Sequence, residues 1–332
     1  MIARKWENTR CGANTRFAPT EDIEVEMTKI NIGGQAVIEG VMMRAPRSVA
    51  IAVRRPSGEI VVKRDMVVPL SERYPLVKLP VVRGAVALFS SLVTGIRALN
   101  FSANEALAGE EGGDKKEELS SWAMAGTMAV AFGFGILLFF IIPLYATRLL
   151  TQLALISDNN IVFNLVDGVI RVAVFLLYIL SISRMKDIQR VFQYHGAEHK
   201  SIFAFEAGEE LTVANVRGHS RLHPRCGTSF LLIVMLVSIV IFSMIPKLWP
   251  FYMKAGSRVV LLPLIAGVSY EFLKWSAKND GMPLVRVLIA PGLALQRLTT
   301  REPDDGQLEV AIRSMKEALE VNDGFKDDRL VI

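Results

Sequence analysis

The chain has 332 residues, of which 51% are hydrophobic, a positive mean hydropathy and a formal net charge of +5 at pH 7. Such a hydropathy is unusual for a soluble globular protein and indicates segments that lie in lipid. The basic residues alternate with acidic ones and flank apolar runs, which argues against a nucleic-acid-binding protein and for a membrane protein. The two cysteines, Cys11 and Cys226, stand in very different settings and predict no disulfide framework.

The N-terminal part of the chain is predicted to lie in water. Residues 1–28 carry many charges and no apolar core, so they are interpreted as a variable N-terminal extension and not as a signal peptide or anchor. Residues 29–79 are predicted to form a small β-rich cytoplasmic domain. Two strand-like runs in it, 48–53 and 60–62, are separated by the turn-forming residues 54–58.

Four apolar runs are predicted to cross a bilayer whose hydrocarbon core is about 30 Å thick. They lie in pairs within 120–183 and 227–275, at 122–145, 161–183, 227–246 and 259–273. Residues 80–119 are predicted to hold an interfacial or re-entrant helix and a linker, because Arg83 and Arg97 leave only thirteen uncharged residues between them. Residues 276–332 are predicted to combine an interfacial segment, 284–295, with a cytoplasmic C-terminal helix at 307–321. The predicted fold class is a mainly α integral membrane protein of about four transmembrane helices with a small β-rich N-terminal cytoplasmic domain.

The distribution of lysine and arginine predicts the orientation. The segment between the second and third runs carries seven of these residues, whereas the loop between the first and second carries Arg148 alone. Basic residues favour the cytoplasmic side. The central loop and both termini are therefore predicted to be cytoplasmic, in a multi-pass protein of the cytoplasmic (inner) membrane.

All the histidines of the chain fall in one predicted cytoplasmic loop, 184–226, which ends in a cysteine. They are His195, His199, His219 and His223, followed by Cys226. His195 and His199 are four residues apart, so on a helix both imidazoles can bind one metal ion, with Glu198 beside them. A further ligand could come from His219, His223 or Cys226, and imidazoles with a thiolate favour zinc.

The order His-x-x-Glu-His resembles, over five residues, the inverted motif of zinc proteases, in which the glutamate activates a water on the metal. Glu198 is therefore predicted to be the general base of a metal-dependent hydrolase. Glu271 is another metal candidate, because a carboxylate near the end of a predicted span is costly unless it is paired or bound to metal.

Other interpretations of the same residues stay open. Histidines on a helix at a membrane surface can bind carboxylates or lipid phosphates, and Cys226 can be a small buried side chain. A closed, structural zinc site would suit a non-enzymatic membrane scaffold or assembly factor. A metal or proton transporter would use Glu271, Asp167 and the histidines as a relay, although Asp167 and Arg171 are more simply a structural pair one helical turn apart.

Three sequence blocks resemble the YqhQ-like family of uncharacterised bacterial membrane proteins. They are GGQAVIEGVMMR at 33–44, YHGAEHK at 194–200 and HPRCGT at 223–228. The resemblance implies a metal-dependent enzyme without an established substrate, and draws attention to Gln35, Glu39 and Arg44. For such a site at the lipid boundary we expect membrane lipid as a partner, a membrane peptide or lipid-like molecule as substrate and no nucleic acid; oligomerisation stays open.

Overall fold

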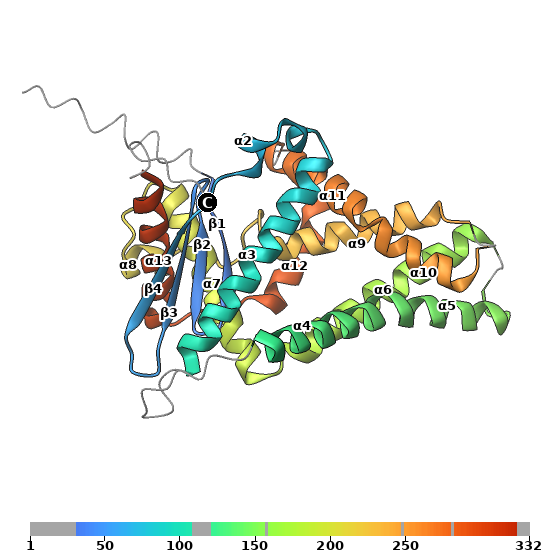
Figure 1. The fold of residues 1–332 in the computed structure, drawn as a ribbon, viewed down its shortest axis with the longest axis horizontal. Helices are drawn as coiled ribbons and strands as arrows, with labels where there is room; N and C mark the ends of the chain where they lie inside the picture. Colours follow the sequence, from blue (N-terminus) through green and yellow to red (C-terminus); the bar gives the residue numbers. More distant parts are fainter. Residues whose placement is uncertain (1–30, 108–120, 157–158, 247–248, 280–281, 324–332) are drawn as a thin grey trace, which may run out of the picture.

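The computed structural model describes residues 31–107, 121–156, 159–246, 249–279 and 282–323. The chain is mostly helical, with one small antiparallel sheet near its N-terminal end. The sheet and the helices packed on it lie at one end of the molecule, and long helices extend from there to the other end (Figure 1).

The sheet is a meander in which each strand pairs with the next. Its order is β1 (Gly33–Val37), β2 (Gly40–Arg44), β3 (Ser48–Arg54) and β4 (Ile60–Met66). The strands expected at 48–53 and 60–62 are confirmed as β3 and β4, joined by a turn in which Gly58 has a φ of 88°. Val37 pairs with Gly40, so Ile38 and Glu39 alone form the β1–β2 turn.

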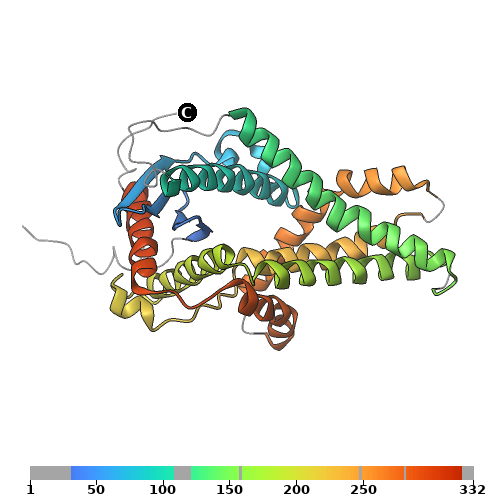
Figure 2. The same cartoon turned by 90° about the horizontal axis from the view of Figure 1, so that it is seen from below.

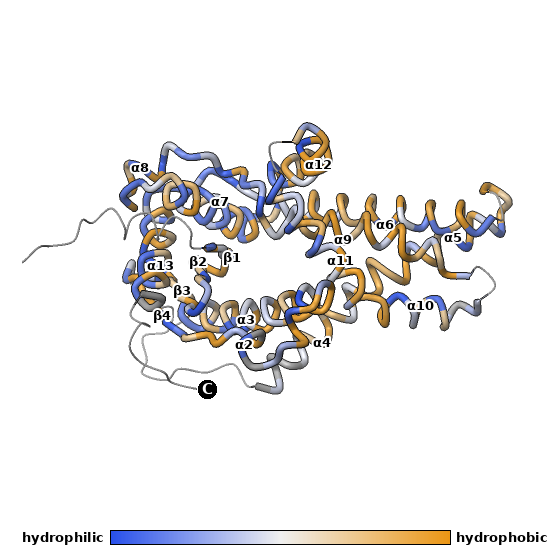
Figure 3. The backbone as a smooth tube through the Cα atoms, turned by 90° about the horizontal axis from the view of Figure 1, so that it is seen from above, coloured by the Kyte–Doolittle hydropathy of each residue, from blue (hydrophilic) through white to orange (hydrophobic). Residues whose placement is uncertain are grey.

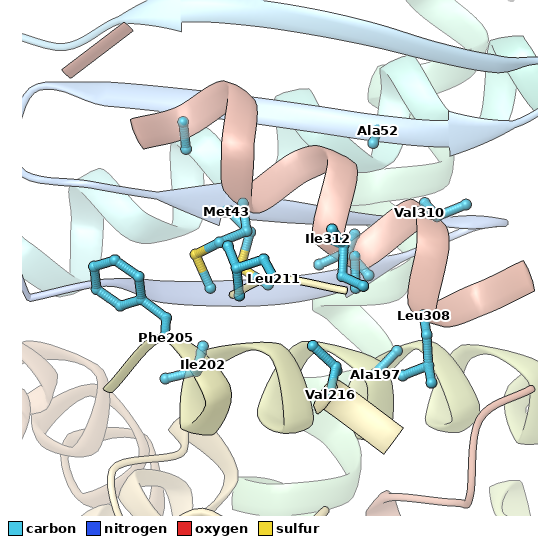
Figure 4. Close-up of a cluster of buried hydrophobic side chains, with 14 of the residues drawn as sticks. Met43, Ala52, Ala197, Ile202, Phe205, Leu211, Val216, Leu308, Val310 and Ile312 are labelled. Atoms are coloured by element: carbon cyan, nitrogen blue, oxygen red, sulfur yellow. The ribbon is translucent and has the colours of Figure 1, made fainter. Parts of the chain in front are cut away.

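One face of the sheet packs on two helices from distant parts of the sequence, α7 (Lys186–Glu206) and α13 (Asp305–Asp323). Met43 and Leu308 belong to this core, which lies between the strands and the two helices (Figure 4). The Met43 N–H donates to Ser314 Oγ at 3.1 Å across 271 residues of sequence. The C-terminal helix therefore completes the N-terminal sheet.

The other face of the sheet packs on α3 (Val82–Leu107), which Figure 2 shows lying on the side of the sheet away from α7. The Ile38 N–H donates to Ser102 Oγ at 3.3 Å near the C-terminal end of α3. The N-terminal end of α3 packs instead on α11 (Leu262–Lys278), where a Cβ at Gly84 would lie 2.6 Å from Tyr270 Cβ. Helix α3 thus connects the sheet to the apolar helices.

Three helices are long and apolar enough to cross a membrane, or four if a bent pair counts as one span, among the described residues and by length and composition. They are Val82–Leu107, Gly126–Gln152, Asn160–Ile182 and the bent pair Tyr252–Val260 with Leu262–Lys278. The hydrophobic residues concentrate along these helices at the end away from the sheet (Figure 3). The remaining helices are α2 (Leu70–Arg73), η1 (Pro75–Lys78), α8 (Val213–Arg217), α9 (Gly227–Ser243) and α12 (Pro283–Thr299).

Helix α3, expected to be interfacial or re-entrant, has the length and composition of a span, whereas α9, in the run expected at 227–246, is shorter than a span. Two of the other expected spans are irregular. The first runs through α4 (Ser121–Ile136), the π-helical turn η2 (Leu137–Ile141) and α5 (Ile142–Gln152). The run expected at 259–273 is not one straight helix, because α10 (Phe251–Val260) and α11 meet at a bend of 43°. Pro263 stands in the first turn of α11, where its missing N–H cannot continue the hydrogen bonds of α10.

The pair expected from Asp167 and Arg171 is present and has a third member. Asp167 accepts from Arg171 Nη2 at 2.6 Å and from Arg258 Nη1 at 2.9 Å, and all three side chains are buried. Arg171 Nε also donates to the Phe139 carbonyl in the π-helical turn at 3.0 Å. The carboxylate therefore ties α6 (Asn160–Ile182) to α10, which is a structural role.

Candidate metal centre

Helix α7 places two histidines beside the segment that joins α12 to α13. Gly196 allows this approach, because a Cβ there would overlap the carbonyl oxygen of Arg301. The Arg301 N–H donates to the Phe192 carbonyl at 2.8 Å and holds the segment against the helix. His195 precedes the glycine, and its imidazole lies against Thr299 at the end of α12.

Each of the two histidines has one ring nitrogen fixed by a backbone carbonyl. His195 Nδ1 lies 2.8 Å from the Thr299 carbonyl oxygen, and His199 Nδ1 lies 2.6 Å from that of Arg221. A carbonyl only accepts, so each Nδ1 carries the proton and each Nε2 keeps a lone pair. Metal-binding histidines are commonly oriented by this kind of contact.

The free nitrogens converge on a cysteine. His195 Nε2 lies 3.2 Å from Cys226 Sγ, and one ligand atom each from His195, His199 and Cys226 lie within 4.8 Å of one another. The two imidazole rings are 4.4 Å apart, centre to centre. Burial lowers the pKa of His199, although its contact with Cys226 acts in the opposite direction, so this imidazole is neutral at pH 7.

Cys226 is buried and caps the N-terminus of α9. Its sulfur accepts the Thr228 N–H at 3.4 Å and lies 3.2 Å from the Thr228 hydroxyl. The capping position therefore holds the sulfur at the N-terminal end of α9, beside His195.

His223 lies beside the cluster but offers it no lone pair. Its Nδ1 accepts the Arg225 N–H at 3.3 Å, and its Nε2 faces Glu206 Oε2 at 3.5 Å. Burial raises the pKa of Glu206, but the facing His223 and the charge of Arg225 outweigh it and leave that pKa below its ordinary value. His223 is therefore adjacent to the candidate ligands, with its ring centre 5.7 Å from that of His199.

The structure places His219 and Glu271, two further predicted metal ligands, with other partners outside the cluster. His219 Nε2 lies 3.0 Å from Glu209 Oε2, and its ring stacks on Phe203. Glu271 accepts from Arg83 Nε at 2.6 Å, between α11 and α3. Each of the two side chains thus has a charged or aromatic partner of its own.

Glu198 is buried between α7 and β1. It lies so close to Gly34 that a Cβ on this glycine would be 2.9 Å from Glu198 Cδ, and its Oε2 has no hydrogen-bond partner among the described residues. Burial raises the pKa of Glu198 to about 7, against the effect of His195 and of the Gly34 and Ala36 amides. The carboxyl group can therefore take up or release a proton near neutral pH.

The structure brings together two imidazoles and one cysteine sulfur, which are side-chain types that bind zinc. Sequence reasoning missed the orienting carbonyls of Thr299 and Arg221, because a backbone carbonyl leaves no residue-type signal. Gly196 does leave a signal in the sequence, since a glycine inside a helix is unfavourable unless another segment packs closely against it.

The comparisons with known proteins agree on one family. Residues 79–321 match the family described as "Protein of unknown function (DUF1385)". The "Uncharacterized protein YqhQ" of Bacillus subtilis (strain 168) is 35% identical over 301 residues, which cover 86% of this chain and 92% of that protein. No solved structure matches the chain.

Proposed function

Because this chain belongs to the family of proteins of unknown function DUF1385, which confirms its YqhQ-like resemblance, we propose a function from the site itself. We propose that it is a membrane-embedded, cytoplasm-facing, zinc-dependent hydrolase. The single observation that supports this most is the convergence of His195, His199 and Cys226, with both histidines in the same tautomer.

An open coordination position distinguishes a catalytic zinc site from a structural one. Structural zinc sites are closed by four protein ligands, whereas catalytic sites keep a position for water or substrate. Of the other two histidines in this loop, His219 contacts Glu209, and His223 uses its Nδ1 to accept the Arg225 N–H. The absence of a fourth ligand among the described residues therefore favours the enzyme over the scaffold.

The chain's own residues supply the remaining parts of a hydrolytic site. Bound zinc would polarise a carbonyl or phosphoryl group and make water a better nucleophile. His195 and His199 hold their rings in place through Thr299 and Arg221. Glu198, with its unpaired oxygen, accepts the proton that the attacking water loses and then donates it to the leaving group.

Membrane association is indicated by the apolar helices, and the finer topology is part of this proposal. Lysine and arginine gather around α7 and the loop after it, so we place the metal site and both termini on the cytoplasmic side. A site carried by α7, α9 and α12 lies next to the apolar helices, which suits a membrane peptide or a lipid-like substrate.

The first experiment measures zinc in the detergent-purified protein by elemental mass spectrometry. We expect about one zinc ion per chain in the native protein and its loss in His195→Ala and Cys226→Ala. His219→Ala is the matched control, since it removes a histidine of the same loop that lies outside the cluster. Native protein without zinc after reconstitution, or equal loss in the control, would contradict the site.

A second experiment separates the hydrolase from the scaffold. In cobalt-substituted protein, thiolate-to-metal absorption reports Cys226, and acetohydroxamate changes the cobalt spectrum only where a coordination position is open. Mass spectrometry then compares a bacterial membrane extract incubated with native protein, with Glu198→Gln and with the control Glu209→Gln. We expect Glu198→Gln to keep the metal and lose a product that the other two form. A spectrum insensitive to acetohydroxamate would instead support a closed structural site.

A further inference from the structure

Arg44, the last residue of β2, is exceptional among the arginines of this structure. Apart from Arg44, the described arginines that are partly or fully buried have polar partners. Examples are Arg55 with Glu105 and Arg221 with Thr300. The described residues offer Arg44 no hydrogen bond, ion pair or ring contact from its side chain, although burial removes part of its hydration and lowers its pKa. A guanidinium that gives up water without gaining a partner is unfavourable.

The surroundings of Arg44 leave room for a ligand. Arg44 pairs with Gly33 and Met42 pairs with Gln35, so these residues face the same side of the sheet. A Cβ added to Gly33 would meet nothing within 4 Å. The Gln35 amide lies against Gly95 of α3 and, like Arg44, has no hydrogen-bond partner among the described side chains. Arg44 and Gln35 are thus two donors without a described side-chain partner on one face of the sheet, and the exposed Gly33 opposite Arg44 leaves that face open.

This space lies where the sheet meets the apolar helices. Along β1, Ile38 contacts α3 at Ser102 and Gln35 contacts it at Gly95, so the Gly33 end lies towards the part of α3 that packs on α11. If the apolar helices cross a bilayer, this end of the sheet faces the headgroups of the cytoplasmic leaflet. Glu198, which precedes His199 on α7, contacts Gly34 from the opposite face of the same strand.

We propose that Arg44 and Gln35 bind the phosphate group of a lipid-type amphiphile. An arginine fork matches two oxygens of a phosphate, and the amide of Gln35 can donate to a third. That this phosphate belongs to the substrate rests on the proposed function, whereas the binding itself does not. The substrate class is then a phosphate-bearing lipid whose reacting bond reaches the zinc cluster past Gly34.

The test is calorimetric titration of the delipidated full-length protein in neutral detergent. The probes are dioctanoyl phosphatidate, the uncharged dioctanoylglycerol and inorganic phosphate. We expect phosphatidate to bind the native protein and to lose about tenfold or more in affinity in Arg44→Gln. Arg44→Lys, which keeps the charge and loses the fork, should fall between the two. Arg47→Gln is the matched control, because Arg47 is exposed and pairs with Glu72 at the surface.

The outcomes are distinct. Equal phosphatidate affinity of Arg44→Gln and native protein, or equal binding of dioctanoylglycerol, overturns the proposal. If inorganic phosphate binds as tightly as phosphatidate and its binding also depends on Arg44, the phosphate site is supported. The proposal that the phosphate belongs to a lipid is then overturned. Unchanged zinc content in each variant shows that the metal centre is intact, and Gln35→Leu should weaken phosphatidate binding if Arg44→Gln does not fold. Phosphatidate binding by a protein that holds no zinc would refute the hydrolase and leave this site standing.

Discussion

Replacing Gly196 by alanine tests whether the close contact of α7 with the segment after α12 holds the metal site. The new methyl group would overlap the Arg301 carbonyl oxygen and would approach Pro303 Cδ to 3.4 Å. The obstacle is backbone, so the segment must move and the 2.8 Å bond from Arg301 N–H to the Phe192 carbonyl is strained or lost. Thr299 lies two residues before Arg301. When the segment moves, the Thr299 carbonyl no longer fixes the imidazole of His195, the residue that precedes Gly196.

The expected magnitude follows from three terms. Overpacking costs about 1–3 kcal/mol, and a lost hydrogen bond costs about 1 kcal/mol. The helix preference of alanine over glycine returns about 1 kcal/mol. The net loss in free energy of unfolding is thus about 1–3 kcal/mol. Zinc affinity should fall by about 10- to 100-fold, because the contact that orients His195 is disturbed.

Thermal unfolding in detergent measures the first effect for Gly196→Ala, and competition with a chelator measures the second. Gly227→Ala is the control, since it is also a helical glycine, stands next to Cys226 and has nothing within 4 Å of its added Cβ. The control should match the native protein or be slightly more stable. Equal stability and equal zinc affinity of the two variants would refute the reasoning.

Two further substitutions test buried polar contacts. Gln296→Leu removes the amide that bonds both backbone groups of His223, at 2.8 and 2.7 Å, and should cost about 1–3 kcal/mol for each group left unsatisfied. Thermal unfolding measures this loss. The zinc content of the folded protein should stay close to that of the native protein, because His223 is not among the three proposed ligands. Asp167→Asn leaves the buried charges of Arg171 and Arg258 unbalanced and should lower the free energy of unfolding by about 3–5 kcal/mol.

Each of these substitutions has a surface counterpart. Gln189→Leu removes an exposed amide that bonds the Arg184 carbonyl at 3.2 Å, and Glu72→Gln breaks an exposed ion pair worth about 1 kcal/mol or less. A loss in Gln296→Leu or Asp167→Asn no larger than in its counterpart would show that the buried contact contributes little.

The parts of the fold that could be predicted from the sequence are those that depend on neighbours in the chain. The turn at 54–58 and the strands beside it follow from residue type, and long uncharged runs mark the apolar helices. Helix α3 is an exception, because it has the length and composition of a span although Arg83 and Arg97 interrupt its uncharged run. The bend between α10 and α11 is another, because a single proline inside an apolar run leaves the hydropathy almost unchanged. Only the order Leu261-Leu262-Pro263 indicates it.

The packing of α13 on the sheet could not be predicted in this way. Its apolar positions indicate a helix with one buried face but do not say what covers that face. The partner is supplied by strands such as β2 and β3, more than 260 residues earlier, through contacts such as Ser314 Oγ to the Ala50 carbonyl. Periodicity within a helix carries no information about a partner so distant in sequence.

For the site, the spacing of His195 and His199 was informative but the third ligand was not determined. His219, His223 and Cys226 were equal candidates by spacing. The choice depends on where α9 begins, because Cys226 caps this helix and its sulfur therefore lies 3.2 Å from His195 Nε2. Helix boundaries are set by tertiary contacts as well as by sequence, so this step needed the structure.

The four histidines of one loop provide an internal comparison that bears on the proposed function. His219 pairs with the carboxylate of Glu209 and stacks on an aromatic ring, which is what a histidine with no metal role does at a surface. His195 and His199 instead receive backbone carbonyls from two unconnected segments, and both use Nδ1 for them. Hydrogen bonding alone would be satisfied by either nitrogen of either ring. The shared choice leaves His195 Nε2 3.2 Å from Cys226 Sγ and leaves the Nε2 of each ring able to accept, which suits the metal ion that we propose.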